Sequence, residues 1–403
     1  RGICKKNTKK NGESIMRIVK ITEKTVQFGS AIANSYISFS KMTNSIVAIV
    51  TDVMRDGKPV IGYGFPSIGR YAPTSILRDR MIPKIMNARP EEIYTDDGEN
   101  LDPFKINALL KSNEKPGGHG DRAHAIGAID MAVWDVVSKI EGRPLYQLLG
   151  ECYNEGQYDS KIYTYGAGGY YYDDDNTDRL KDELKSYLDM GFHDVKMKIA
   201  GTDLASDLKR IEAALSVVGY DGSRLMVDAN GRYDLKEALE CAVAIRDYKL
   251  KWYEEPLDPL DFSSHGAVAE YYPASIATGE NLFSYQDMRN LLRHGGLRPD
   301  RDYIQMDCPL SHGLVEYMKV LQMMKERGWS SRRCIPHGGH QFCSNIAAGL
   351  FLGGNECYPG VFQPFGGFAD GYPVEDGYVR LPNVPGVGFE AKANLWELMK
   401  DMA

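Results

Sequence analysis

From residue 161 onward, short strand-like runs alternate with amphipathic helical stretches, and this alternation restricts the fold more than any other feature of the sequence. Helical stretches such as Leu204–Val217 and Leu235–Tyr248 repeat apolar residues with the period of a helix. Eight such units predict an α/β fold, a (β/α)7β barrel of the TIM type. A doubly wound sheet is the alternative, but no GxGxxG or P-loop sequence marks a nucleotide site. The predicted strands are Lys161–Tyr165, Asp194–Lys198, Leu225–Asp228, Trp252–Glu254, Ile276–Thr278, Tyr303–Met306, Arg333–Ile335 and Pro359–Phe362.

A different order of elements precedes the barrel. Strand-like patterns from Met16 to about Gly64 are followed by helical patterns up to Ile140, which suggests a separate α+β domain. We therefore expect an α+β domain at 16–150, the barrel at 151–373, and a segment at 374–403 that returns to the first domain. Residues 1–15 are rich in basic and poor in apolar side chains, which is typical of a disordered or tag-derived extension.

Composition narrows the class of protein. The chain has 403 residues, 43% of them hydrophobic, enough for a large core. A net charge of −7 with dispersed basic residues argues against nucleic-acid binding. No apolar run is long enough to span a membrane or to act as a signal peptide, so we expect a soluble, cytoplasmic protein. Seven cysteines without a CxxC pair indicate reduced thiols.

Ionisable residues lie at or just beyond the ends of six consecutive predicted strands. In a barrel these ends converge on one mouth, where active sites are found. Taken singly, each residue is better explained as an ordinary surface or salt-bridged group. The steps between them are 30, 26, 26, 27 and 30 residues, one βα unit each, and this regularity favours a common site. The six residues are Lys198, Asp228, Glu254, Glu280, Asp307 and His337.

Three of the six are neighbouring carboxylates, Asp228, Glu254 and Glu280. Buried carboxylates that meet in one place repel one another unless a cation lies between them. Oxygen ligands on rigid strand ends suit Mg²⁺, which keeps open positions for water or substrate. The sequence therefore predicts a magnesium site.

At these residues the sequence resembles the enolase superfamily, and within it the mandelate racemase subgroup. The resemblance covers the chain from Met16 onward and implies an α+β capping domain over a (β/α)7β barrel. The stretches 128–135 and 144–150 resemble the link between these domains. The matching motifs are Lys196-Met-Lys198, Asp228-Ala-Asn230, Trp252-Tyr-Glu-Glu-Pro256, Thr278-Gly-Glu280, and Asp307 with His337 in Ile335-Pro-His-Gly-Gly-His340.

The resemblance implies a Mg²⁺-dependent acid-sugar dehydratase, and at its closest it implies D-tartrate as substrate and oxaloacetate as product. Such enzymes pair a Lys or His base with Mg²⁺. Lys198 is the expected base, and the Lys196 ammonium should lower the pKa of Lys198 and contact the substrate carboxylate. On the opposite face, His337, oriented by Asp307, is the expected acid that protonates the departing hydroxyl.

Substrate choice is expected to come largely from loops of the capping domain, such as 32–39 and 64–71. The expected ligand is a hydroxy diacid or sugar acid. Family members are commonly oligomeric, so a homo-oligomer is expected. Candidate contacts to the substrate, besides Lys196, are Asn34, Asn230, His340 and Gln363.

Other functions stay open at this point. A racemase or epimerase of a 2-hydroxy acid would use the same Lys198 and His337, and another sugar-acid dehydratase would use the same motifs. Cycloisomerases and dipeptide epimerases of the muconate type usually carry a lysine where this chain has Asp307, which disfavours them. A metal-dependent hydrolase would need a histidine pair in the first strand, and Lys161–Tyr165 has none. A binding protein without activity is the remaining alternative.

Overall fold

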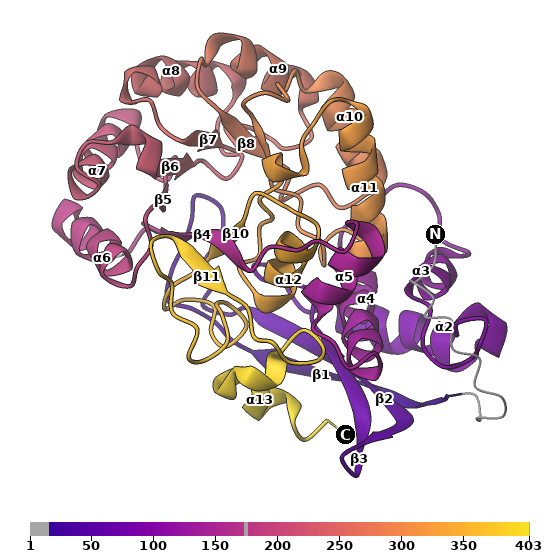
Figure 1. Cartoon of the computed structure of the whole chain (residues 1–403). Coiled ribbons are helices and arrows are strands. Elements are labelled where there is room, and N and C mark those ends of the chain that lie inside the picture. Colours follow the sequence, from indigo (N-terminus) through magenta and orange to yellow (C-terminus); the bar gives the residue numbers. More distant parts are fainter. Residues whose placement is uncertain (1–15, 173–175, 403) are drawn as a thin grey trace.

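The computed structural model describes residues 16–172 and 176–402 (Figure 1). The extension expected at residues 1–15 lies outside this part of the chain. The N-terminal region begins with an antiparallel sheet of order β1-β2-β3. Its elements are β1 (Ile18–Gln27), β2 (Thr43–Arg55), β3 (Lys58–Gly64), α1 (Thr74–Ile76), η1 (Leu77–Met81), α2 (Ile82–Met86), η2 (Pro90–Glu92), α3 (Pro103–Lys111) and α4 (Asp121–Ile140).

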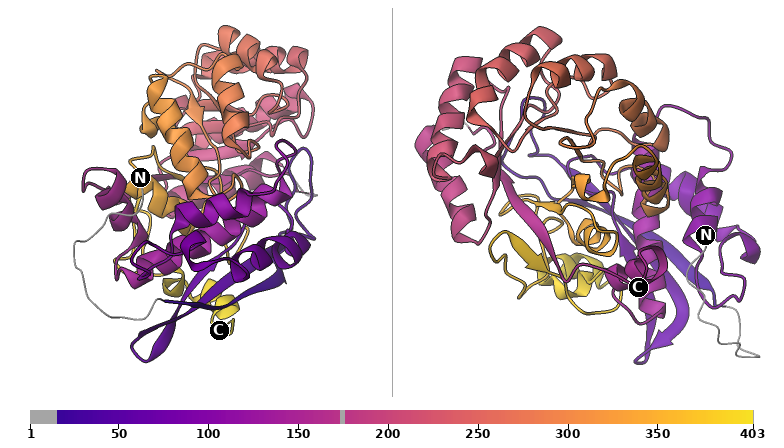
Figure 2. Two further views of the ribbon diagram at one scale, coloured as in Figure 1. Left: turned by 90° about the vertical axis from the view of Figure 1, so that its right-hand side faces the viewer. Right: turned by 45° about the horizontal axis from the view of Figure 1, so that its top comes forward.

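Helix α4 packs closely on this sheet. Two glycines of β3 make the approach possible, because a Cβ on Gly62 or on Gly64 would lie 2.2 Å from a backbone oxygen of α4. Most residues of α4 are buried, since the sheet covers one side and the barrel the other. Figure 2 shows the N-terminal sheet and its helices packed beside the barrel.

A curled parallel sheet forms the second region, with strand order β10-β4-β5-β6-β7-β8-β9. Helix α5 (Leu145–Tyr153) leads into it, and the later helices lie outside the strands (Figure 1). The strands are β4 (Lys161–Gly168), β5 (Val195–Lys198), β6 (Leu225–Asp228), β7 (Trp252–Glu254), β8 (Ile276–Thr278), β9 (Tyr303–Ile304) and β10 (Asn355–Cys357). The helices are α6 (Thr177–Asp189), α7 (Leu204–Val217), η3 (Gly222–Arg224), α8 (Leu235–Ile245), η4 (Arg246–Tyr248), α9 (Phe262–Tyr271), α10 (Tyr285–His294), α11 (Leu314–Glu326), η5 (Ser331–Arg333) and α12 (Gln341–Gly349).

The predicted fold class is confirmed: an α/β chain with a curled parallel sheet and an N-terminal capping domain. Two predicted strands differ. The segment Arg333–Ile335 contributes only a bridge between Cys334 and Ile304. The predicted strand Pro359–Phe362 is wrong, because the strand that pairs with β4 is β10.

The last strand escaped prediction because its residues are polar. Asn355 and Glu356 of β10 are fully buried, so the strand lacks an apolar run. The apolar pair Val361-Phe362 lies instead in the loop that follows. There the Phe362 ring packs edge-on against Phe39 and Tyr358, with both centroid distances at 5.0 Å.

The C-terminal segment contains β11 (Tyr378–Arg380), η6 (Phe389–Ala391) and α13 (Ala393–Met399). Strand β11 pairs antiparallel with β4. Helix α13 lies beside the N-terminal sheet, where the Trp396 ring packs edge-on against Tyr63 at 5.5 Å and Lys24 Nζ donates to the Leu398 carbonyl at 3.2 Å (Figure 1).

Two loops of the N-terminal region reach the ends of the barrel strands. In the first, Ser35 Oγ donates to the Ala229 carbonyl at 3.3 Å and Tyr36 Oη to the Gly231 carbonyl at 3.2 Å. The second follows β3 and brings Ser67 to Asp307. The capping domain thus covers the strand ends on which the predicted site residues lie.

Two further expectations concern the chain as a whole. Within the described ranges, no helix is long and apolar enough to cross a membrane. The cysteines described there are free thiols, as predicted: Cys152, Cys241, Cys308, Cys334, Cys343 and Cys357.

Candidate active site at the barrel mouth

The register of the parallel strands places site residues of neighbouring strands side by side, at the same level along the barrel axis. Lys198 pairs with Asp228 across β5 and β6, and Asp228 pairs with Glu254 across β6 and β7. Asp307 and His337 follow β9 and the Cys334 bridge at the same end. All six predicted residues are buried, with at most 7% of their surface exposed. Buried charges at this density require partners of opposite charge.

The three predicted metal ligands lie together. One carboxylate oxygen from each of Asp228, Glu254 and Glu280 lies within 4.8 Å of the others. Burial, and next to it the carboxylate of Asp228, raises the pKa of Glu254 to about 8. In the metal-free protein the Asp228 carboxylate thus disfavours the charged form of Glu254. An all-oxygen donor set whose carboxylates repel one another fits a hard divalent cation.

Glu254 is held in place by neutral donors. Trp252 Nε1 and Gln305 Nε2 both donate to its Oε2, at 2.8 and 2.9 Å. The other oxygen accepts from Lys196 Nζ at 2.6 Å. Hydrogen bonds from neighbouring side chains to a carboxylate of this kind orient it before a metal binds.

The lysine pair differs from the prediction in its electrostatics. Lys198 is paired with Asp228. Burial alone would lower the pKa of Lys198, but the surrounding acidic groups, of which Asp228 has the largest effect, together outweigh burial and raise it. Lys196 does lower the pKa of Lys198, as expected, but the net shift in the metal-free protein is upward. Lys196 has its own carboxylate partners, so its repulsion of Lys198 is the weaker effect.

The second partner of Lys196 is Glu356, which was not predicted. Its Oε1 lies 2.6 Å from Lys196 Nζ, and the Tyr358 hydroxyl donates to its Oε2 at 2.6 Å. The residue is fully buried on β10. It falls 19 residues after His337, outside the regular step of 26 to 30. The sequence feature that could have pointed to Glu356 is a glutamate within the short polar segment Asn355–Cys357, close after His337.

The predicted dyad is formed. His337 Nδ1 lies 2.9 Å from Asp307 Oδ2, and the Leu310 N–H donates to Asp307 Oδ1 at 3.1 Å. Burial would lower the pKa of His337, but the carboxylates of Glu280 and Asp307 outweigh it and raise the pKa. The raised pKa favours the protonated imidazolium, the form that can donate a proton.

Two of the predicted substrate contacts lie in the cluster. Lys196 bridges Glu254 and Glu356. The Asn230 backbone N–H donates to Asp228 Oδ1 at 2.9 Å, while its side-chain Oδ1 is buried without a hydrogen-bond partner. An unpaired buried acceptor of this kind can accept from a hydroxyl group of a ligand.

The side chains of the other three candidates form hydrogen bonds with other groups of the protein. The Asn34 side-chain oxygen accepts from the N–H groups of residues 36 and 37, both at 2.9 Å, and so shapes its own loop. The His340 ring contacts Ser67 and the N–H of Cys343. Gln363 is exposed, and its Oε1 accepts from Lys392 Nζ at 3.0 Å.

The capping domain supplies one further charge that was not singled out by residue. Arg70, in the predicted loop 64–71, lies 3.5 Å from Glu280 Oε1 and donates to Asn281 Oδ1 at 2.5 Å. Asn281 in turn donates to the buried carboxylate of Glu255. A guanidinium half-buried beside a predicted metal ligand can bind a second anionic group.

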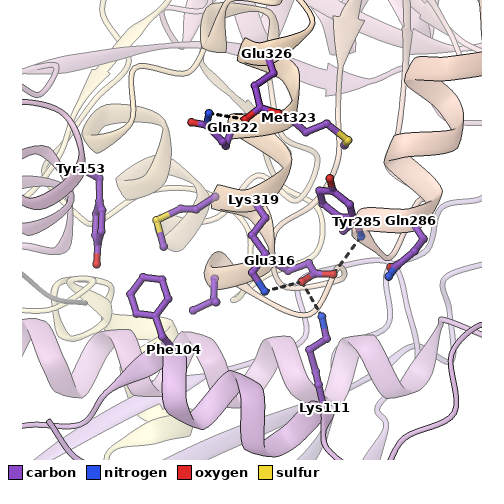
Figure 3. Close-up of a pocket in the computed structure, with 12 residues that line it drawn as sticks. Phe104, Lys111, Tyr153, Tyr285, Gln286, Glu316, Lys319, Gln322, Met323 and Glu326 are labelled. Atoms are coloured by element: carbon purple, nitrogen blue, oxygen red, sulfur yellow. Dashed lines mark hydrogen bonds and ion pairs between the residues drawn. The ribbon is translucent and has the colours of Figure 1, made fainter. Parts of the chain in front are cut away.

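A separate groove of about 600 Å³ lies between α3, α10 and α11 (Figure 3). Phe104 and Tyr153 line its apolar part. Glu316 lies 2.7 Å from Lys111 and 3.6 Å from Lys319, and Gln322 donates to Glu326 Oε1 at 2.8 Å. The predicted site residues lie at the barrel mouth instead.

A capped α/β barrel with an acidic triad between a lysine and a histidine–aspartate dyad defines the class of protein. Comparison with known families agrees with this architecture. Residues 20–150 match the N-terminal domain of mandelate racemase and muconate lactonizing enzyme, and residues 179–395 match the enolase C-terminal domain-like family. The chain belongs to the enolase superfamily, in its mandelate racemase and muconate lactonizing subgroup.

Several relatives act on sugar acids. An arabinonate dehydratase of Saccharolobus solfataricus is 28% identical, over 75% of this chain and 79% of its own length. An L-talarate/galactarate dehydratase of Salmonella typhimurium is 27% identical, over 74% and 69%. A 3,6-anhydro-α-L-galactonate cycloisomerase of Streptomyces coelicolor is 30% identical, over 68% and 70%. None of these three is a D-tartrate enzyme, and the third reopens the cycloisomerase alternative.

A solved structure supports the fold. A racemase from Streptomyces coelicolor with bound magnesium superimposes with a TM-score of 0.76, at 23% identity, over 94% of this chain and 99% of its own.

Proposed function

We propose that this chain is a Mg²⁺-dependent dehydratase of sugar acids. The observation that carries the proposal is the buried triad of carboxylates, within 4.8 Å of one another, beside Lys198 and the Asp307–His337 dyad. The dehydratases among the relatives support the reaction class, and the magnesium bound by the Streptomyces racemase supports the metal.

Asp228, Glu254 and Glu280 would hold the cation. When bound, it would neutralise the triad and stabilise the negative charge that develops on the substrate carboxylate as its α-proton leaves. The donor set fits, because each ligand offers an oxygen and the Asp228 carboxylate repels that of Glu254.

The protein groups divide the remaining work. Lys196 would donate a hydrogen bond to the substrate carboxylate, since its ammonium already faces carboxylate oxygens. Lys198 would accept the α-proton as the C–H bond breaks. His337, held by Asp307, would protonate the hydroxyl at the β-carbon as the C–O bond breaks and water departs. The resulting enol ketonises to a 2-keto acid.

We further propose D-tartrate as the substrate and oxaloacetate as the product. A diacid needs a cationic group at each end. The cation and Lys196 would bind the reacting carboxylate. Arg70 lies beside Glu280 on the capping side, where it would bind the second carboxylate of the diacid. The motif resemblance adds support, and the relatives named above set the competing substrates.

Incubation of the protein with Mg²⁺ and single acids, followed by semicarbazide detection of 2-keto acids, tests the proposal. D-Tartrate should give oxaloacetate, with galactarate, L-talarate and arabinonate as comparison substrates. A keto acid from one of these three alone would keep the dehydratase and reject tartrate. Inversion of a stereocentre without keto acid would favour a racemase. Isomerisation without loss of water would favour a cycloisomerase.

Chelation provides a separate prediction. Excess EDTA should reduce turnover at least about 100-fold, because the substrate carboxylate would lose its main charge partner. Readdition of Mg²⁺ should restore the rate. The control is circular dichroism of the EDTA-treated protein, which should stay unchanged. Full activity in EDTA would exclude the metal from the reaction.

A further inference from the structure

A buried network joins the capping domain to the Asp307–His337 dyad. Ser67 lies in the loop that follows β3, and its side chain is fully buried. Its hydroxyl lies 2.5 Å from Asp307 Oδ2 and 3.1 Å from His340 Nε2. The same oxygen of Asp307 contacts His337 Nδ1 at 2.9 Å. A serine of the first domain therefore contacts the dyad of the second.

The chemistry of the groups fixes the direction of each hydrogen bond. The Cys343 N–H points at His340 Nδ1, which makes that nitrogen the acceptor. Burial lowers the pKa of His340 to about 4, so the ring is neutral near pH 7. A neutral imidazole carries one N–H. This N–H lies on Nε2 and donates to Ser67, whose hydroxyl then donates to the Asp307 carboxylate.

The backbone of Ser67 is held in an unfavourable conformation. Its φ is 53°, in the left-handed region where glycine has no penalty. The Asn44 side chain donates to the Ser67 carbonyl at 3.0 Å and helps to hold this geometry. Strain of this kind persists where the surroundings impose it, and it clusters at functional sites. A serine at this position is thus better explained by its hydroxyl than by its backbone.

The local packing leaves room for this hydroxyl and little more. Gly338 has a φ of 115°, and a Cβ there would lie 2.7 Å from both Ser67 Oγ and Asp307 Oδ2. Asp307, His340 and Cys343 lie within 4.8 Å of one another and could in principle hold a metal. The Ser67 hydroxyl already bridges two of the three, so the group reads as a hydrogen-bonded network.

We propose that Ser67 is a positioning residue, supplied by the capping domain, that fixes the Asp307 carboxylate and through it the His337 ring. The inference rests on the proposed role of His337 as the acid. It assigns the capping domain a part in the acid step, in addition to the choice of substrate, because Asp307 receives the Ser67 hydrogen bond only when that domain is docked.

The test combines a spectroscopic and a kinetic measurement on the Mg²⁺-loaded protein. The variants are Ser67→Gly and Ser67→Ala, which lose the hydroxyl, and Ser67→Thr, which keeps it. The matched control is Ser138→Ala, which removes another buried serine hydroxyl of the capping domain that donates to the Trp134 carbonyl. ¹⁵N-histidine labelling reports the downfield Nδ1 proton of His337 among eight histidines, assigned with His337→Asn.

Loss of the hydroxyl should shift or broaden the His337 Nδ1 proton signal and lower kcat for D-tartrate about 10- to 100-fold, with KM changed less than about threefold. Ser67→Thr should recover most of both, and Ser138→Ala should alter neither. The proton signal needs no substrate, so it tests this inference even if the proposed function fails. An unchanged His337 signal in Ser67→Gly would overturn the inference.

Thermal stability distinguishes the effect of the hydroxyl from the effect of the backbone strain. Ser67→Gly and Ser67→Ala lose the same hydrogen bonds, but the positive φ at this position is strained for alanine and not for glycine. The glycine variant should therefore melt at the higher temperature, while both show the same kcat. Activity that follows the melting temperature instead of the hydroxyl would also overturn the inference.

Discussion

Replacement of Lys198 with Ala should lower dehydration by on the order of 10³-fold or more while the protein stays folded. In the proposed mechanism this amine accepts the α-proton, and proton abstraction next to a carboxylate has no other route of comparable rate. A loss of 10³-fold corresponds to about 4 kcal/mol of transition-state stabilisation. The measurement is kcat/KM for D-tartrate at saturating Mg²⁺.

The same substitution removes the closer of the two ion-pair partners of Asp228 and leaves Lys196, whose Nζ lies 3.6 Å from Asp228 Oδ2. Asp228 is fully buried, so the metal-free variant should be less stable than the parent. Saturating Mg²⁺ should restore most of the loss if Asp228 is a metal ligand, because ligand binding to the folded state stabilises it. Thermal melting with and without Mg²⁺ measures this effect.

Lys251→Ala is the matched control for Lys198→Ala. Lys251 also belongs to the barrel and also pairs with a buried aspartate, Asp194, at 2.5 Å. It should lose stability without losing kcat. If Lys198→Ala and Lys251→Ala reduced turnover equally, Lys198 would have no place in the proton transfer.

The barrel and most of its charged rim were predictable because spacing carries the information. One βα unit takes 26 to 30 residues here, and a strand end recurs once per unit. The six predicted residues follow this rule, and the structure places them at one end of the sheet. Apolar periodicity in the helices set the unit length without any knowledge of contacts.

Glu356 escaped prediction because the rule fails at the last strand. Its strand is three residues long, polar and fully buried, so apolar patterning passes over it. The stabilising contact for the buried glutamate is Lys196, which lies 160 residues earlier in the chain. A long-range ion pair leaves no local mark in the sequence.

The net pKa shift of Lys198 was also missed. The spacing places Asp228 at the same barrel mouth as Lys198, but it does not show that the two groups form an ion pair. In the structure, Asp228 has the largest effect among the acidic groups that raise the pKa of Lys198. Arg70 and Ser67 lie in the predicted loop 64–71, but neither could be singled out, since each contacts a barrel residue more than 200 positions away in the sequence.

Replacement of His337 with Asn should separate the two halves of the reaction. Asparagine can still accept or donate a hydrogen bond toward Asp307, but it cannot protonate a departing hydroxyl. Dehydration should therefore fall by about 10²- to 10⁴-fold. Lys198 is unchanged in this variant, so in D₂O the α-proton of D-tartrate should still exchange with solvent, as followed by ¹H NMR.

The matched control is His193→Asn. His193 also contacts an aspartate, with its Nδ1 2.6 Å from Asp194 Oδ1. It is half-exposed and precedes β5, so it lies at the opposite end of the barrel from the carboxylate triad. This variant should keep both dehydration and exchange. Loss of exchange together with dehydration in His337→Asn would make His337 the base, and retained dehydration would remove it from the chemistry. Exchange without dehydration is the result that assigns proton abstraction to Lys198 and hydroxide departure to the dyad.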